Sequence, residues 1–90
     1  MTSYQSSIKQ AESELAKHVQ REAWSDANRA QGFLQGVKDA TGNTPDWKQQ
    51  IQEGIYAEMI EKKEYGDAAY WLSYISGRSH GELSIRLDNA

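Results

Sequence analysis

Residues 3–40 read SYQSSIKQAESELAKHVQREAWSDANRAQGFLQGVKDA, with no proline and no glycine before Gly32. Apolar residues recur at steps of three and four, which places them on one side of a helix. These positions are Tyr4, Ile8, Ala11, Leu15, Val19, Ala23, Ala27, Ala30, Leu34 and Val37. An unbroken helix of this length would measure about 55 Å, more than the roughly 25 Å width of a compact domain of this size. We therefore expect the helix to project, to pair with a second chain, or to break.

The spacing changes inside this stretch and predicts where the helix breaks. From Leu15 to Ala27 the apolar residues follow one another at steps of four, and consecutive fours rotate the stripe around the helix, as a stutter does in a coiled coil. Ser25 and Asp26 lie in this rotation and are good N-caps. We predict a bend or interruption near residues 24–26, in preference to one straight rod.

Composition indicates one small domain. The chain has 90 residues, a net charge of −3 and no cysteine, which excludes disulfide and thiol chemistry. Residues 1–40 carry five basic and five acidic side chains, and residues 41–90 carry five and eight, so the acidic excess lies in the second half. No apolar run has membrane-spanning length, and the N-terminus lacks a signal-peptide pattern. We expect a cytoplasmic protein with no membrane partner.

The second half of the chain opens with the clearest loop, residues 41–44. Gly42 is suited to cap the end of the first helical region. Thr44 followed by Pro45 is typical of an N-cap and the first position of a helix. The sequence therefore predicts a helix over residues 45–63, with Trp47 beginning its apolar side.

A short aromatic-rich helix is predicted over residues 67–76, after a turn at residues 65–67 in which Asp67 is a candidate N-cap. Its large side chains point in nearly every direction, which is typical of a segment buried on most sides, so we expect it to be the hub of the core. Gly77 is expected to end it. The tail, residues 78–90, is ambiguous between helix, strand and extended arm: Ser79 with Glu82 fits a capping box, while Leu83, Ile85 and Leu87 alternate with polar residues as in a strand. A lone strand would have nothing in this chain to pair with, so we favour a short helix or an extended arm. The predicted fold is all-α, a single domain over residues 1–90 with three or four helices, in which the long N-terminal helix packs on a C-terminal aromatic-rich helical hairpin.

Motifs for chemistry are absent or weak. Glu14, His18 and Glu22 lie four residues apart, so their side chains could bind one metal ion together. Helix-bundle metal sites instead place Glu and His three residues apart and repeat that pair on other helices, and this pattern is absent. Ser79 and His80 are adjacent, and neighbours in sequence seldom have the geometry of a nucleophile and its base. The chain contains no phosphate-binding loop, dinucleotide fingerprint or zinc spacing. We therefore predict no catalytic, metal or cofactor site and no enzyme activity.

Gly32, Phe33 and Gly36 suggest a contact surface. At about 100° per residue the two glycines lie roughly opposite the Ala30–Leu34–Val37 stripe. That helix then has two contact faces, one for the core and one for another element or partner, and bare glycine surface lets a second backbone approach closely. The competing interpretation is two ordinary glycines near a helix end.

The best functional prediction is a non-catalytic protein–protein interaction module that binds another protein and forms a homodimer through its N-terminal helix. In general character the chain resembles the small acidic inhibitors that phages make against host enzymes or defence complexes. That resemblance implies a viral anti-defence inhibitor that occupies a nucleic-acid-binding surface of its target. Its acidic contacts would be Glu58, Glu61, Glu64 and Asp67.

Two alternatives stay open. The first is a helix-turn-helix-like DNA-binding regulator with residues 67–76 as recognition helix. That segment has no lysine or arginine, so direct nucleic-acid binding is disfavoured. The second is a small metal-binding or enzymatic helical protein.

Overall fold

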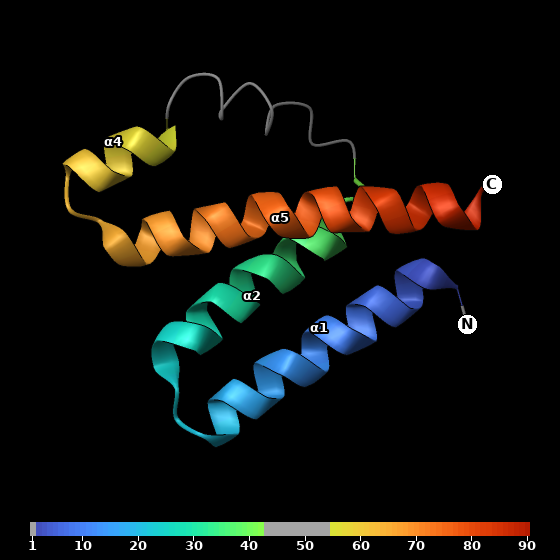
Figure 1. The fold of residues 1–90 in the computed structure, drawn as a ribbon, viewed down its shortest axis with the longest axis horizontal. Helices are drawn as coiled ribbons and strands as arrows, with labels where there is room; N and C mark the ends of the chain where they lie inside the picture. Colours follow the sequence, from blue (N-terminus) through green and yellow to red (C-terminus); the bar gives the residue numbers. More distant parts are fainter. Residues whose placement is uncertain (1, 43–54) are drawn as a thin grey trace.

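The computed structural model describes residues 2–42 and 55–90, and 84% of these residues are helical, with no strand among them. Four helices follow in the order α1 (Ser3–Gln20), α2 (Trp24–Asp39), α4 (Ile55–Glu61) and α5 (Tyr65–Asp88). Helices α1 and α2 form a hairpin, and the end of α2 lies against the middle of α5 (Figure 1). The predicted all-α fold is confirmed.

The predicted interruption of the N-terminal helix is confirmed, at residues 21–23 rather than 24–26. Helix α1 ends at Gln20, and Glu22 adopts a left-handed backbone with φ of 56°. The N–H of Ala23, the N-cap of α2, donates to the carbonyl of His18 over 2.9 Å. The predicted caps Ser25 and Asp26 instead lie inside α2, because the left-handed residue has already reversed the chain.

This reversal removes the physical reason for expecting a dimer through the N-terminal helix. The two halves of the stretch pack on each other instead of projecting as one rod. The start of α1 is tied to the end of α2, since the Tyr4 hydroxyl donates to the carbonyl of Val37 over 2.6 Å. It is also tied to the end of α5, where the Asp88 carboxylate accepts the backbone N–H of Ser3.

Helix α5 is longer than predicted. It starts at Tyr65, so Asp67 lies in its first turn and is not its N-cap, and it continues to Asp88. The prediction that Gly77 ends the helix is wrong, and residues 78–88 are its second half rather than a separate tail. The chain reverses before Tyr65, where Lys63 has a φ of 61°. The predicted N-cap Thr44 and most of the predicted helix 45–63 lie outside the described residues, and α4 lies within that range.

Gly77 does not end α5 because it is a packing residue, one of several glycines at the contact between α2 and α5. A Cβ on Gly77 would meet the backbone of Phe33, and a Cβ on Gly81 would lie 3.0 Å from the Val37 carbonyl oxygen. The glycines of α2 are covered in the same way by α5. We call these four glycines, Gly32, Gly36, Gly77 and Gly81, the glycine seam. These glycines lie where the backbones of two helices contact each other, and none of them lies at the end of a helix.

The core is small. Among the described residues the buried apolar side chains are Ala11, Ala27, Leu34, Val37 and Ala68. The predicted hub, residues 67–76, packs closely on α2, where a Cβ on Gly32 would meet the backbone of Tyr70. Its large side chains are only partly buried, however, and Leu72 is 50% exposed. The closest packing is at the glycine seam.

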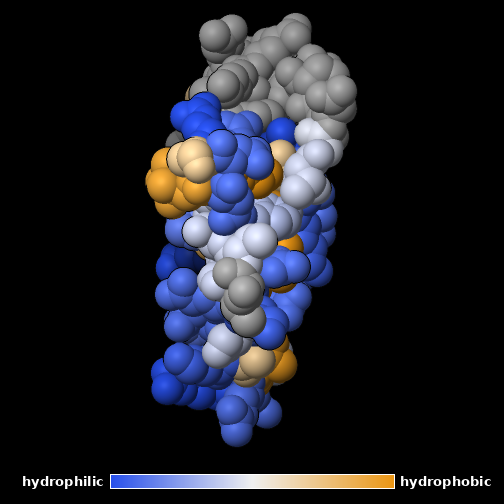
Figure 2. Space-filling view, turned by 90° about the vertical axis from the view of Figure 1, so that its right-hand side faces the viewer, coloured by the Kyte–Doolittle hydropathy of each residue, from blue (hydrophilic) through white to orange (hydrophobic). Residues whose placement is uncertain are grey.

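The shape accounts for this small core. The Cα atoms extend over 41 × 35 × 14 Å, so the helices lie side by side in little more than one layer. Figure 2 views this layer edge-on from the end that carries the C-terminus and shows how narrow it is. A helix in a single layer has neighbours on only some of its sides, which leaves large apolar side chains exposed.

None of the described helices has the length and apolar character needed to cross a membrane.

Candidate functional site

A polar junction joins α1 to α5. The Ser7 hydroxyl lies 3.1 Å from His80 Nε2 and 2.7 Å from the Ser84 hydroxyl. Ser84 donates in turn to the backbone carbonyl of His80 over 3.0 Å. Ser7 and Ser84 are buried, and the His80 ring lies 5.6 Å from the Phe33 ring, centroid to centroid. The junction holds three helices together at one point.

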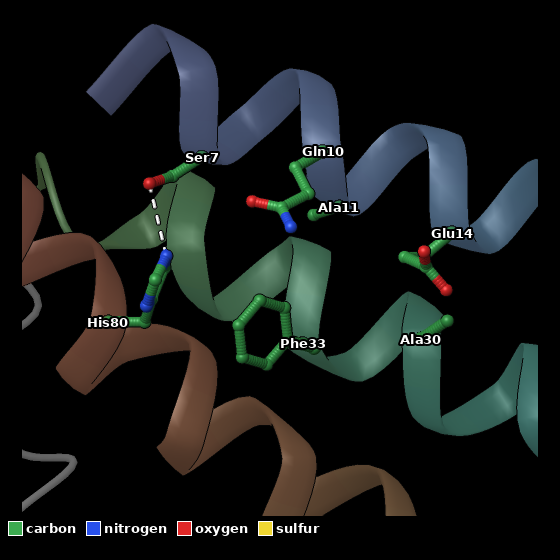
Figure 3. A pocket seen from close by; sticks show the side chains of 7 residues that line it. All are labelled: Ser7, Gln10, Ala11, Glu14, Ala30, Phe33 and His80. Atoms are coloured by element: carbon green, nitrogen blue, oxygen red, sulfur yellow. Dashed lines mark hydrogen bonds between the residues drawn. The ribbon is translucent and has the colours of Figure 1, made fainter. Parts of the chain in front are cut away.

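Beside this junction is a hollow of about 310 Å³ between α1, α2 and α5 (Figure 3). It is lined by Ser7, Gln10, Ala11, Glu14, Ala30, Phe33 and His80. Figure 3 places Ser7 and His80 at one end and Glu14 at the other, with Phe33 between them. Apolar Ala11, Ala30 and Phe33 form part of the walls, and the polar Gln10 lies between the two ends, on the side of α1.

The Ser7–His80 distance is that of a nucleophile and a base, but the surroundings favour a structural role. A catalytic pair needs a third group that orients the imidazole, and the one carboxylate lining the hollow, that of Glu14, lies at the far end from His80. The Ser7 hydroxyl is already shared with Ser84. The predicted neighbours Ser79 and His80 are not paired, since Ser79 is exposed and His80 contacts Ser7.

The residues weighed as metal ligands are not brought together as one set. Glu14 and His18 approach to 4.0 Å, while Glu22 lies beyond the end of α1 in the left-handed turn. Over residues 2–42 and 55–90, no group of three or more histidines and carboxylates could hold a metal ion.

A second polar network, which was not predicted from the sequence, lies where α2 meets α5. The Asp39 carboxylate accepts hydrogen bonds from Gln35 over 2.8 Å and from the Tyr74 hydroxyl over 2.7 Å. Buried Arg78 donates to the Tyr74 hydroxyl over 3.4 Å. Burial, followed by the hydrogen bond to Asp39, raises the pKa of Tyr74 above its ordinary value. The sequence signal for this network was the four-residue spacing of Gln35 to Asp39 and of Tyr74 to Arg78, which brings each pair together on one face of a helix.

The predicted contact residues Gly32, Phe33 and Gly36 lie inside the fold. Both glycines are buried beneath α5, and Phe33 is half-buried beside His80. Helix α2 does have two contact faces, and within the described chain they are occupied by α1 and α5.

The four predicted acidic contacts gather around the turn between α4 and α5. Glu58, Glu61, Glu64 and Asp67 are all exposed. Lys62 lies among them and pairs with Glu58 over 2.9 Å, and that hydrogen bond raises the pKa of Lys62. Lys62 and Lys63 offset two of the four negative charges, so this end of the molecule is acidic but only moderately so.

One face of α5 carries a row of large exposed apolar side chains. At about 100° per residue they fall within an arc of about 60°, with Ser76 and Ser79 near the middle of the row. We call this row the α5 stripe: Tyr65, Leu72, Leu83 and Leu87, which are 50% to 60% exposed. The stripe was not predicted from the sequence, because residues 65–88 were divided into two segments.

The chain matches no protein-family model, and no curated protein or solved structure is significantly similar to it.

Proposed function

We propose that this chain is a non-catalytic module that binds another protein through the α5 stripe. The observation that carries the proposal is the contrast between the stripe and the core. Four large apolar side chains lie in line on the outer face of α5, each at least half exposed, while the buried apolar residues of the described chain are mostly alanines. An aligned apolar face of this kind is typical of a helix that lies in a partner's groove.

The charge near the stripe indicates what the partner surface carries. Glu58, Glu61, Glu64 and Asp67 surround the end of α5 where the stripe begins. They suit a partner with basic side chains beside an apolar groove. A surface that binds nucleic acid is basic in this way, and a module that covers such a surface acts as an inhibitor.

Position-specific photo-crosslinking in cells tests the proposal. A photoreactive amino acid replaces Leu83 in the stripe, and Val19, which is 45% exposed at the α1–α2 turn, is the matched control position. We expect discrete protein adducts from position 83, either with a second copy or with another protein, and none above background from position 19. Equal adducts from both positions, or none from position 83, would overturn the proposal.

The acidic contacts are tested in the same assay. Replacing the four carboxylates by Gln or Asn should weaken any adduct with another protein. The four side chains are exposed, so the core should stay intact, and unchanged circular dichroism checks this.

A further inference from the structure

We infer that the α5 stripe binds a second copy of this chain, with the two α5 helices antiparallel. This inference rests on the proposed function, since it takes the α5 stripe as a protein-binding surface, and it commits to a second copy as the occupant of that stripe in place of a basic partner surface. The two central leucines of the stripe, Leu72 and Leu83, are spaced symmetrically about a point between Ser76 and Ser79, and Tyr65 and Leu87 lie farther out toward the two ends of the helix. Leu72 lies four residues before Ser76, and Leu83 lies four residues after Ser79.

With the two helices antiparallel, this spacing makes the face complementary to itself. Leu72 then lies opposite Leu83 of the second copy, and Leu83 lies opposite its Leu72. Ser76 meets Ser79 of the second copy at the two-fold axis, where small side chains let the helices approach closely. A two-fold interface requires this reciprocity between residues. A parallel pair would instead bring Arg86 near Arg86 of the second copy and Glu64 near its Glu64, so like charges would meet.

Charge supports the same arrangement. Arg86 and Glu64 flank the same side of the stripe, at opposite ends of α5. In the antiparallel pair Arg86 lies level with Ala69 of the second copy, and its long side chain reaches toward Glu64 there. Over the described ranges, no ion pair within 4.0 Å involves Arg86 or Glu64. Both charges are therefore available to a partner.

The shape of the single chain provides the driving force. A chain of this size buries only a modest core and is often stabilised by association. Here the layer is thin, and the largest buried side chain with under 2% exposure is a single valine, Val37. Pairing through α5 would bury the leucines that the layer leaves exposed.

Charge rescue in analytical ultracentrifugation tests the inference. Leu72→Glu and Leu83→Lys each place a charge opposite a leucine in the antiparallel pair, so each variant alone should dimerise at least tenfold more weakly than wild type. Mixed together, they form one Glu–Lys contact and one Leu–Leu contact, and we expect a one-to-one heterodimer to return. In a parallel pair, the mixed dimer would place both charges opposite leucines and form no Glu–Lys contact, so mixing would not restore the affinity of the wild type.

Cysteine pairing gives a second readout that does not depend on removing a leucine. The chain has no cysteine, so Ser76→Cys and Ser79→Cys can be introduced one at a time. A mixture of the two should form a mixed disulfide in preference to either homodisulfide. Val19→Glu is the matched control, and it should dimerise like wild type.

The outcomes separate the two proposals. Monomeric wild type at 100 µM or more, or a mixture without rescue, overturns the antiparallel dimer. If position 83 still crosslinks to a different protein, the binding function stands with another partner. If wild type is monomeric and position 83 gives no adduct, both proposals fail. Circular dichroism of each variant establishes that it is folded.

Discussion

Single glycines determine how closely α2 and α5 approach. A Cβ on Gly36 would lie 2.8 Å from the backbone nitrogen of Arg78, and one on Gly32 would lie 2.5 Å from the Tyr70 carbonyl oxygen. Both are shorter than the 3.0 Å limit that real Cβ atoms respect. Since the obstructing atoms belong to backbone, a rotamer change cannot relieve the clash. The helices themselves would have to separate.

The first prediction is therefore that Gly36→Ala destabilises the fold by about 2–3 kcal/mol, the cost of overpacking a close contact. Gly66→Ala is the matched control. Gly66 is also a helical glycine, in α5, but a Cβ on it would meet nothing within 4 Å. We expect it to stabilise by about 0.5 kcal/mol, since alanine restricts the unfolded chain. Urea unfolding followed by circular dichroism measures both, and equal effects would contradict the close-contact interpretation.

A contact between elements adds to the local cap that begins α1, in which Thr2 and Gln5 form a capping box. The Asp88 carboxylate at the end of α5 accepts the backbone N–H groups of Ser3 and Tyr4 over 2.7 and 3.0 Å. These are donors that the first turn of a helix leaves without an intrahelical partner. The hydrogen bonds, led by that from Tyr4, lower the pKa of Asp88 below its ordinary 3.8. One end of α5 thus acts as a cap for the start of α1.

This contact predicts a pH dependence whose sign can be stated. Because the pKa of Asp88 is lower in the folded state, the stabilisation is present above pH 3.8 and is lost as pH falls through the folded-state pKa. Asp88→Asn should lower the urea midpoint at pH 7, and the gap to wild type should narrow on acidification below pH 3.8. A gap that stays constant from pH 7 to pH 2 would contradict this role of the carboxylate.

The local sequence pattern predicted the helices but not the contacts between them. The steps of three and four predicted α1 and α2, and the run of fours marked their interruption within a few residues. Gly77 was interpreted as a helix end because a glycine's local signature is the same whether it caps a helix or faces another backbone. What distinguishes the two is Phe33, 44 residues earlier, against which Gly77 packs.

The candidate site was harder to predict for the same reason. The Ser7–His80 contact joins residues 73 apart in the sequence, and neither residue lies in a local motif. The α5 stripe was in principle visible, since Leu72 and Leu83 fall on one line of an unbroken helix. Dividing that helix at Gly77 hid the alignment.

At the scale of the whole molecule, a single layer of helices distributes stability unevenly. The glycine seam joins the second half of α2 to the middle of α5, where Leu34, Val37 and Gly77 are buried. Helix α4 is only seven residues long, and its side chains at residues 57, 58, 60 and 61 are exposed. A short helix gains little stability from its own hydrogen bonds and depends on packing.

Hydrogen exchange should reveal this gradient. We expect the amides of residues 34–37 and 77–81 to exchange only through global unfolding, and those of residues 59–61 to exchange through local opening, on the order of 100-fold faster. Gly36→Ala should then accelerate the slow set and leave residues 59–61 nearly unchanged, because local opening of α4 does not require the seam to separate. Equal protection of α4 and the seam would mean that the layer unfolds as one cooperative unit, and that the few contacts between α4 and α5 are stronger than their exposure indicates.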